Sequence, residues 1–383
     1  NNNNIMKITL NELSGSLGDL GTYLPLVIGL AKLNLIDINV VLFLSGILNI
    51  ITAIAWDCPM PVQPMKSIAS VAITESILTK ESILTSGILI GGIVLLIGIS
   101  KTIEYINKLI SKCIISGIQL GLGFKMSIKG LEYIINSSII EIIISIILGV
   151  LTFISFNFNK IPSALILVII GTIYSLCTMV YPNYNFIIPI DINIIQNISK
   201  NDWYIGFMYG ALPQLPLTLL NSVLSVCALS KELFPENNKV NRISVSSSVG
   251  LMNLLTCPLG GLPMCHGAGG LAGQYKFGAR NGFSIMFLGI IKVLIGLCLG
   301  NLLSNILYSF PNWILGILLF FSGLELAIKA VNNDCNIITL ITATIQITTN
   351  TFIGTMSGLL LSFVQYLIEY IKINYSCSLR IIN

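Results

Sequence analysis

Long runs of apolar residues, separated by short polar stretches, recur along almost the whole chain. A run of about 20 apolar residues can cross the hydrocarbon core of a bilayer as a helix. The pattern predicts fourteen such spans, some of them shortened by breaks. They lie near 17–33, 39–56, 63–78, 84–100, 110–127, 134–156, 161–180, 203–229, 243–258, 264–277, 282–303, 311–330, 335–349 and 351–372. We therefore expect an all-α polytopic membrane protein embedded in a lipid bilayer.

The composition supports this prediction and excludes several other classes of protein. Only 9% of the 383 residues are charged, 54% are hydrophobic and the mean hydropathy is +0.89. Charged residues make up about 25% of an ordinary soluble domain. A soluble enzyme and a disordered chain are excluded on this ground. The net charge of +4 is modest, and no basic stripe with interleaved aromatic residues indicates a nucleic-acid partner.

Nine cysteines are scattered along the chain, and they form no CxxC pair. Most of them lie in apolar runs, where a cysteine behaves as a small hydrophobic residue. The pattern therefore predicts no disulfide framework, no metal site and no cofactor.

The longest linker, residues 181–202, leaves seven predicted spans before it and seven after it. We expect an N-terminal tail at 1–16, a first unit at 17–180, a second unit at 203–372 and a short tail at 373–383. In this arrangement most of the 20 lysines and arginines share the side of the N-terminus. Loops rich in lysine and arginine favour the cytoplasmic side of a membrane, so both termini are expected in the cytoplasm. The membrane itself would be the plasma membrane or an internal organelle membrane.

Short matches between the two units indicate an internal repeat. Gly46-Ile-Leu-Asn49 in the second span corresponds to Gly250-Leu-Met-Asn253 in the ninth, and a proline-bearing break follows each of them. Upstream, Leu24-Pro-Leu26 corresponds to Leu215-Pro-Leu217. An odd number of spans repeated in tandem inserts the second copy upside down. That is the inverted-repeat design of secondary transporters, which places the site at mid-membrane between broken helices.

The two breaks interrupt spans three and ten. Pro59, Pro61 and Pro64 end a helix in the first break, because proline lacks an amide hydrogen and clashes with the preceding turn. We expect short helices to start near Pro64 and near His266, with their starts facing each other at the bilayer centre. Helix starts present free N–H groups and partial positive charge, so two facing starts make a cradle for an anion.

Six residues around the breaks are candidates for substrate binding: Gln63, Lys66, Ser67, Gln214, His266 and Gly267. Lys66 would attract the anion; alternatively it reaches the cytoplasmic interface or pairs with Asp19. Gln63 and Gln214 lie in proline-flanked segments, where an amide can donate to a ligand or satisfy freed backbone groups. Gln214 belongs to a segment expected to interrupt span eight in midcourse.

Three further titratable residues have more than one interpretation. His266 is the only histidine and could donate to the anion, carry a coupled proton or serve structurally. Asp19 in span one and Glu325 in span twelve are candidates for coupling or gating. Asp19 could instead be a structural partner of Lys66 or a charge at a helix start. Lys292 is interpreted as a charge that reaches the membrane interface.

Four longer motifs cover both units in a fixed order. They are Glu12–Pro25, Pro59–Ala69, Leu212–Thr218 with Asn221-Ser-Val, and Pro263–Arg280. These motifs closely resemble those of the molybdate transporter family, a branch of the sulfate permease superfamily. The resemblance implies a uracil-permease-like fold, in which a core domain moves against a gate domain. Spans one to four and eight to eleven would form the core, and the others would form the gate and often a homodimer contact.

The resemblance also implies a function. The chain would be a secondary active transporter of a tetrahedral oxyanion, molybdate first and sulfate second, with a proton as one option for the coupling ion. Sulfate permeases proper carry a regulatory domain after the last span, and we expect none after residues 373–383. The alternatives are a passive anion channel and a proton-coupled nucleobase permease of the same fold. Nucleobase carriers hold the base with glutamates on spans eight and ten, and those spans lack them here.

Overall fold

The structure is a computed structural model that describes residues 9–103, 112–156, 162–181, 192–331 and 337–382, together with residues 185 and 190. Most of these residues are helical. The helices are α1 (Leu10–Ser16), η1 (Leu17–Asp19), α2 (Leu20–Lys32), α3 (Ile38–Trp56), α4 (Lys66–Thr74), α5 (Lys80–Ile99), α7 (Lys112–Ile135), α8 (Ile139–Phe156), α9 (Ser163–Thr178), η2 (Ile192–Asn197), α10 (Lys200–Ile205), η3 (Gly206–Ala211), α11 (Leu212–Leu217), η4 (Thr218–Ser225), α12 (Val226–Leu233), α13 (Arg242–Thr256), η5 (Cys257–Leu259), α14 (Ala268–Lys276), α15 (Phe283–Cys298), α16 (Asn301–Tyr308), α17 (Asn312–Val331), α18 (Ile337–Thr348) and α19 (Thr351–Ile382). The strands are β1 (Val62–Pro64) and β2 (Met264–His266).

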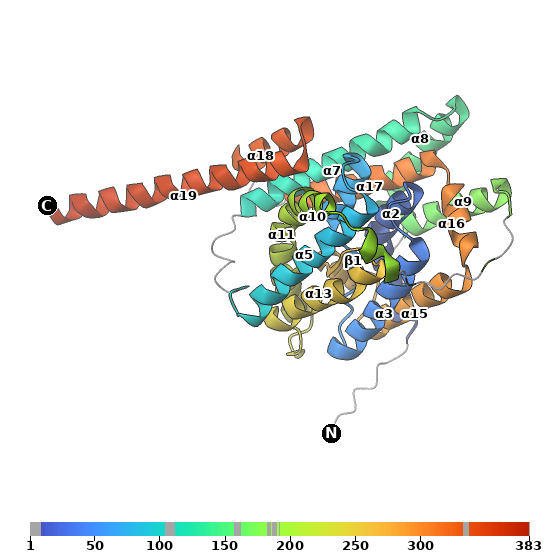
Figure 1. Cartoon of the computed structure of the whole chain (residues 1–383), viewed down its shortest axis with the longest axis horizontal. Coiled ribbons are helices and arrows are strands. Elements are labelled where there is room, and N and C mark those ends of the chain that lie inside the picture. Colours follow the sequence, from blue (N-terminus) through green and yellow to red (C-terminus); the bar gives the residue numbers. More distant parts are fainter. Residues whose placement is uncertain are drawn as a thin grey trace, which may run out of the picture.

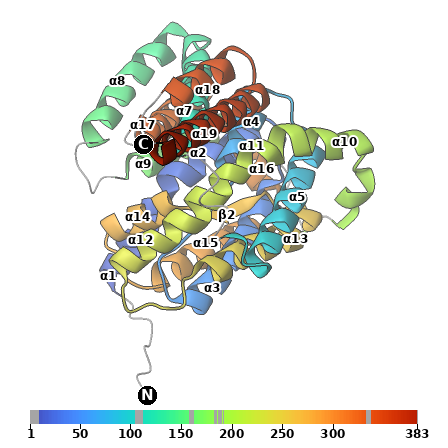
Figure 2. The same ribbon diagram turned by 90° about the vertical axis from the view of Figure 1, so that its left-hand side faces the viewer.

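The helices form two groups. We divide the helices by their packing into a core group, which consists of α1–α5 and α10–α16 with both strands, and an outer group, which consists of α7–α9 and α17–α19. Helices α2, α4 and α16 contact both groups. In the core group α3 packs along α15 and α5 packs along α13, and in the outer group α7 packs along α17. Figure 1 shows the whole chain, with α19 reaching far beyond the body, and Figure 2 shows α7, α8, α18 and α19 above α3, α13 and α15.

Glycines let the paired helices approach closely. Gly46 on α3 faces α15, and a Cβ at this position would lie 2.7 Å from the carbonyl oxygen of Gly289. Gly123 on α7 faces α17 in the same way, and its Cβ would lie 2.6 Å from the carbonyl oxygen of Gly323. A side chain at either position would push the backbones apart, so these crossings depend on small residues, as they commonly do in membranes.

Polar side chains define where several helices begin. Asp37 accepts hydrogen bonds from the first turn of α3. Thr79 and Ser82 form a capping box at the start of α5, and Asn241 and Ser244 form one at the start of α13. A capping box satisfies amide groups that have no partner in the first turn. The two paired helices α5 and α13 therefore begin with the same device.

The segment around Gln214, predicted to be interrupted, is a continuous helix. Elements α10, η3, α11, η4 and α12 follow one another without a gap from Lys200 to Leu233, and η3 and η4 are π-helical. Pro213 lies in the first turn of α11 and Pro216 lies inside it. Each proline lacks an amide hydrogen and so removes one helical hydrogen bond. The neighbouring π turns, with their wider hydrogen-bond spacing, accommodate this loss, and the helix continues. The predicted midcourse interruption is therefore wrong.

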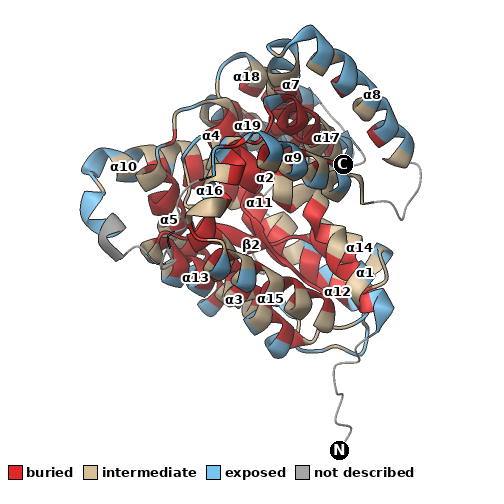
Figure 3. Cartoon of the chain, turned by 90° about the vertical axis from the view of Figure 1, so that its right-hand side faces the viewer, coloured by how far each residue is buried: buried red, intermediate tan, exposed pale blue. Residues whose placement is uncertain are grey.

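Several helices have the length and composition of membrane spans. Among the described residues, α3, α5, the segment Lys200–Leu233, α17 and Thr351–Ile368 of α19 are each long and apolar enough to cross a bilayer. Helices α15 and α16 pass the same test together, although they meet at 97°. Buried residues fill the centre and exposed residues lie on the periphery (Figure 3), where α8 exposes isoleucines. The chain is thus a multi-pass membrane protein, and its fourteen spans and two repeats stay predictions.

Candidate functional site

The two breaks pair with each other as a short antiparallel ladder. Gln63 in β1 lies opposite Cys265 in β2, and Val62 lies opposite His266. All the residues of both strands are buried. The prolines of each break prevent a helix and leave the backbone extended. The extended backbone of the first break then pairs with that of the second. This two-stranded element, missing from the all-helical prediction, brings the starts of α4 and α14 together in the core group.

Two matched asparagines hold the ladder in place. The side-chain Oδ1 of Asn49 on α3 accepts from the Val62 amide at 2.7 Å, and that of Asn253 on α13 accepts from the Met264 amide at 2.8 Å. Both asparagines are fully buried. These are the asparagines that correspond in the two sequence units. The same side chain therefore makes the same bond at the first strand residue of each break.

Helices α4 and α14 begin directly after the strands, and within the described residues neither is capped by the side chain of its own N-cap residue. Met65 precedes α4 and Gly267 precedes α14, and neither makes a side-chain cap hydrogen bond. The first amides of α4 and α14 therefore need other partners or a ligand. Gln214 supplies one of these partners, because its Oε1 accepts from the Ser67 amide at 2.8 Å. Its Nε2 donates to Thr218 Oγ1 at 3.0 Å, which fixes the orientation of the amide.

A small cavity, here the central cavity, lies between the two helix starts. Its lining consists of Gln63, Lys66, Gln119, Gln214, Leu217, Asn221, Ser222, Cys265, Gly267 and Leu326. Its volume of about 20 Å³ exceeds the roughly 10–15 Å³ that one water molecule requires. No carboxylate is among the described residues of this lining, and the ammonium of Lys66 supplies its only formal charge there. The lining is thus neutral to positive and rich in amides and hydroxyls, which suits an anion.

Gln63 connects the central cavity to Asp19. Its Nε2 donates to Asp19 Oδ1 and, at 3.1 Å, to Thr22 Oγ1. Its Oε1 has no hydrogen-bond partner within the described part of the chain and lies against Gly267, where an added Cβ would collide with it. Glycine at this helix start therefore leaves the space that the Gln63 side chain occupies. Asp19 itself is buried and forms no ion pair with Lys66 that meets hydrogen-bonding distance among the described residues.

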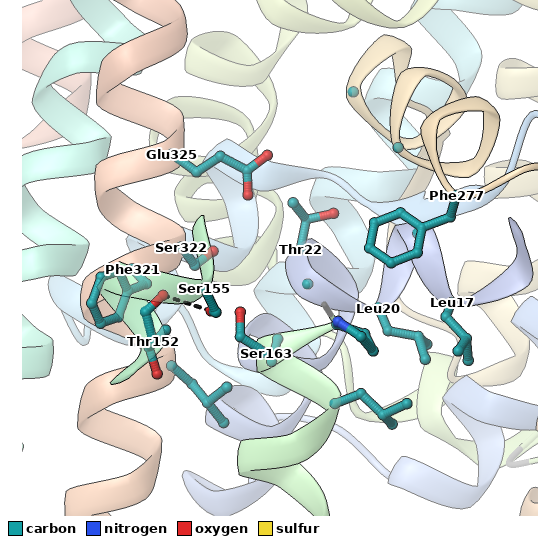
Figure 4. A pocket seen from close by; sticks show the side chains of 18 of the residues that line it. Leu17, Leu20, Thr22, Thr152, Ser155, Ser163, Phe277, Phe321, Ser322 and Glu325 are labelled. Carbon is teal, nitrogen blue, oxygen red and sulfur yellow. Dashed lines mark hydrogen bonds between the residues drawn. The ribbon is translucent and has the colours of Figure 1, made fainter. Parts of the chain in front are cut away.

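Two further cavities lead away from Lys66 toward the outer group. A linking cavity shares Lys66 with the central cavity and is also lined by Thr22, Glu325 and Lys329. A wide cavity of about 310 Å³ shares these last three residues and adds Lys276. It lies between α2 and α14 of the core group and α8, α9 and α17 of the outer group. Figure 4 shows Glu325 from α17 and Thr22 from α2 near each other among the side chains that line the wide cavity.

Glu325 and Lys329 form an ion pair at the junction of these cavities. The distance from Lys329 Nζ to Glu325 Oε1 is 2.6 Å, and about a third of each side chain is exposed. Lys329 Nζ also lies over the start of α14, since a Cβ at Gly269 would be 2.8 Å away from it. The pair therefore brings a cation and a carboxylate from the outer group next to the second helix start.

The structure does not bring His266 into the central cavity. Strand residues alternate in direction, so Cys265 lines the cavity whereas His266 points to the other face. Its Nε2 lies 3.2 Å from Ser248 Oγ, and its ring meets the Trp56 ring edge to face at 5.3 Å. The described residues offer no group of three metal-ligating side chains with which it could bind a metal ion. Its predicted role at the substrate stays a prediction without a contact in this cavity.

Several lining residues were not predicted as substrate-binding residues, although Asn221 and Ser222 belong to one of the four motifs. Gln119 on α7 is a lone amide in an apolar run, and its only signal is polarity beside glycines. Asn221 and Ser222 continue the motif around Gln214 by two helical turns, so helical spacing could have assigned them to the same side. Lys329 was not among the predicted site residues, because its position beside α14 depends on the packing of two distant helices.

Comparison with protein families matches both halves of the chain. The family described as "Molybdate transporter of MFS superfamily" matches residues 11–126 and 206–326. Molybdate transporter 2 of Arabidopsis thaliana is 37% identical over 370 aligned residues, covering 84% of this chain and 78% of the relative. Molybdate transporter 1 of the same plant is 34% identical over 421 aligned residues, covering 96% and 91%. Molybdate transporter 1 of Chlamydomonas reinhardtii is 30% identical, covering 84% of both chains.

Solved structures with the same fold come from other transporters. The transmembrane domain of the cyanobacterial bicarbonate transporter BicA superposes with a TM-score of 0.63 and covers 92% of this chain and 98% of its own. The murine anion transporter Slc26a9 in its inward-facing state gives 0.67 and covers 95% and 69%. Both are 14% identical in sequence, so they establish the fold alone. The match over both halves and the identity to full-length relatives establish that this chain belongs to the molybdate transporter family.

Proposed function

We propose that the chain is a secondary active transporter of a tetrahedral oxyanion, molybdate first and sulfate second. The observation that carries the proposal is the central cavity, where Lys66 and the starts of α4 and α14 meet without a lining carboxylate. The relatives, which are named molybdate transporters, support molybdate as the substrate and transport as the activity. No catalytic reaction is part of the proposal.

The size of each electrostatic contribution indicates which group of the central cavity stabilises a bound anion most. Moving an isolated ion into apolar surroundings costs tens of kcal/mol in the idealised limit. One helix start returns about 0.3–2 kcal/mol, and charge-assisted hydrogen bonds return about 1.5–3 kcal/mol each. An ammonium at about 4 Å returns roughly 4 kcal/mol at an effective dielectric constant of about 20. The Lys66 charge is therefore the largest single contribution, and the helix starts with Gln63, Gln119 and Asn221 supply the rest.

The proposed mechanism is alternating access, with the core group as the core domain and the outer group as the gate domain. The central cavity is too small for a tetrahedral oxyanion in this conformation, since it holds about 20 Å³. The linking and wide cavities lie between the two groups, so a displacement of one group against the other would open or close this route. The proposed units 17–180 and 203–372 are inverted repeats, supported by the matching bonds of Asn49 and Asn253.

We propose a proton as the coupling ion and Glu325 as its carrier. Glu325 lies on the route between the wide cavity and Lys66. It pairs with Lys329 at 2.6 Å, and Lys66 lines the linking cavity and Lys276 the wide cavity. An oxyanion arriving among these lysines would weaken their hold on the carboxylate, so anion and proton would bind together. A Glu325→Gln variant should then take up molybdate at a rate that no longer responds to an imposed pH gradient.

Uptake by proteoliposomes tests the function directly. The purified full chain is reconstituted, and uptake of radiolabelled molybdate is followed with and without a pH gradient. We expect saturable uptake that excess sulfate reduces and excess uracil leaves unchanged. Competition by uracil alone would support the nucleobase permease, and a current without saturation or gradient dependence would support the passive channel. Neither outcome is compatible with an oxyanion carrier.

A further inference from the structure

Lys292 on α15 is buried inside the core group, against the sequence interpretation that it reaches the membrane interface. Only 3% of its surface is exposed, and its Nζ has no hydrogen-bond partner among the residues that the structure describes. The Nζ lies 3.5 Å from the centre of the Tyr23 ring. Tyr23 is itself fixed by a 3.0 Å hydrogen bond between its hydroxyl group and Ser45 Oγ. A ring face attracts an ammonium but does not neutralise its charge.

The negative charge that accompanies Lys292 is Asp19. Asp19 is 1% exposed and lies one helical turn before Tyr23, so both side chains lie on the same side of the helix. The Lys292 ammonium lies over the Tyr23 ring on this side of the helix, near enough to Asp19 for their charges to interact, but the described residues show no direct Lys292–Asp19 ion pair of 4.0 Å or less. Asp19 Oδ2 has no hydrogen-bond partner among the described residues, whereas Oδ1 accepts from Gln63.

A single charge at this depth is costly unless an opposite charge lies nearby, because a buried charge without a counter-charge is uncompensated. We propose that Lys292 is a built-in counter-cation of Asp19, and that the pair holds Gln63 in place in the oxyanion site. Lys292 is thus a positioning residue that acts through Asp19 and Gln63. Because the ammonium is tethered to α15, no free cation such as Na⁺ is required at this carboxylate. This inference rests on the proposed function.

The test compares single and double variants of the reconstituted full chain. Lys292→Met leaves Asp19 without its cation, whereas Asp19→Asn combined with Lys292→Met removes both charges. We expect molybdate uptake per folded protein to fall about a hundredfold in the single variant, because one buried charge is left alone. The double variant should recover at least about tenfold of that loss. Lys231→Met, the same change at an exposed lysine, should leave uptake unchanged.

The KM for molybdate separates positioning from simple stability. If Lys292→Met displaces Gln63 from the site, the affinity for molybdate falls, and we expect the KM to rise at least about tenfold. A purely structural role would lower the amount of folded protein and leave the KM unchanged, which would overturn the inference. Wild-type uptake should be equal in sodium and choline media, and a sodium requirement would also overturn it.

The remaining outcomes are equally decisive. Uptake by Lys292→Met at the wild-type rate, or a double variant no better than the single one, contradicts the proposed charge pairing of Lys292 with Asp19. If the single variant does not fold, a double variant that does fold supports the pair, and one that also fails contradicts it. A wild-type chain without molybdate uptake contradicts the proposed function, and the stability comparison of the variants then still decides the inference.

Discussion

The two proline-bearing breaks pair as the strands β1 and β2, but they contribute different kinds of groups to the central cavity. The first break and its helix carry polar and charged groups, namely Gln63, Lys66 and Ser67. The second carries Cys265 and the glycines at the start of α14, which offer backbone and space. The backbone arrangement is nearly symmetric, because Asn49 and Asn253 hold equivalent strand residues, whereas the side chains are not.

This difference shows how one repeated scaffold can build an asymmetric site. A symmetric pair of lysines would place two ammonium groups against each other across a cavity of about 20 Å³, where like charges repel strongly. One break therefore supplies the charge, and the other supplies the room that Gln63 occupies next to Gly267. The contribution of each break can be removed separately.

Removal of the charge from the first break should have the largest effect. Lys66→Ala deletes the ammonium of the central cavity, and we expect molybdate uptake to fall about a hundredfold or more, since a desolvated charge interaction is lost. Lys66→Arg keeps the charge and should retain part of the activity. Proteoliposome uptake at several molybdate concentrations measures both. Normal flux of molybdate and sulfate in a folded Lys66→Ala variant would contradict the assignment of Lys66.

Filling the space of the second break should have the next largest effect. Gly267→Ala adds a Cβ that collides with Gln63 Oε1, and such overpacking typically costs about 1–3 kcal/mol. We expect uptake to fall about tenfold to a hundredfold, as the amide is displaced from the cavity. Gly92→Ala on α5 is the matched control, because no atom of the described residues lies within 4 Å of its added Cβ. Equal activity of the two variants would show that Gln63 has room to move.

The equivalent hydrogen bonds of Asn49 and Asn253 predict that loss of either asparagine has a similar and smaller effect on stability. Asn49→Ala and Asn253→Ala each leave a strand amide buried without its acceptor, which costs about 1–3 kcal/mol. We expect both variants to lower the unfolding temperature by similar amounts and to reduce uptake moderately. Thermal unfolding in detergent measures this. A large loss in one variant and none in the other would contradict the proposal that the two units are built alike.

The positions of the breaks could be predicted from the sequence, whereas their mutual pairing could not. The prolines fix where a helix cannot continue, so the predicted helix starts near Pro64 and His266 lie two residues from the observed ones, Lys66 and Ala268. A strand of three residues is too short to show a periodic pattern in the sequence. The strands β1 and β2 pair with each other, and this pairing cannot be seen from either segment alone. The π turns around Pro213 were missed for a related reason, since a proline signals a missing donor and not how the chain compensates.

Side-chain direction was the main obstacle at the site. His266 and Cys265 are neighbours in sequence, and only the strand geometry decides which of them faces the cavity. Lys292 looked like an interfacial charge because Tyr23, whose ring its ammonium contacts, lies far away in the chain. Lys66, Gln63 and Gln214 were identified because polar residues beside prolines in an apolar run are a local signal. Contacts that depend on two distant helices leave no such signal.

Ser67 provides the smallest and most discriminating comparison within the first break. Its amide donates to Gln214 Oε1, whereas its Oγ is buried without a hydrogen-bond partner among the described residues. Ser67→Ala keeps the amide bond and removes a hydroxyl group that is not satisfied here. We therefore expect little loss of stability and a change in uptake within about threefold, less than 1 kcal/mol. A loss as large as that of Lys66→Ala would mean that the Ser67 hydroxyl binds the oxyanion directly. The helix starts, and not the lysine charge, would then be the main source of affinity.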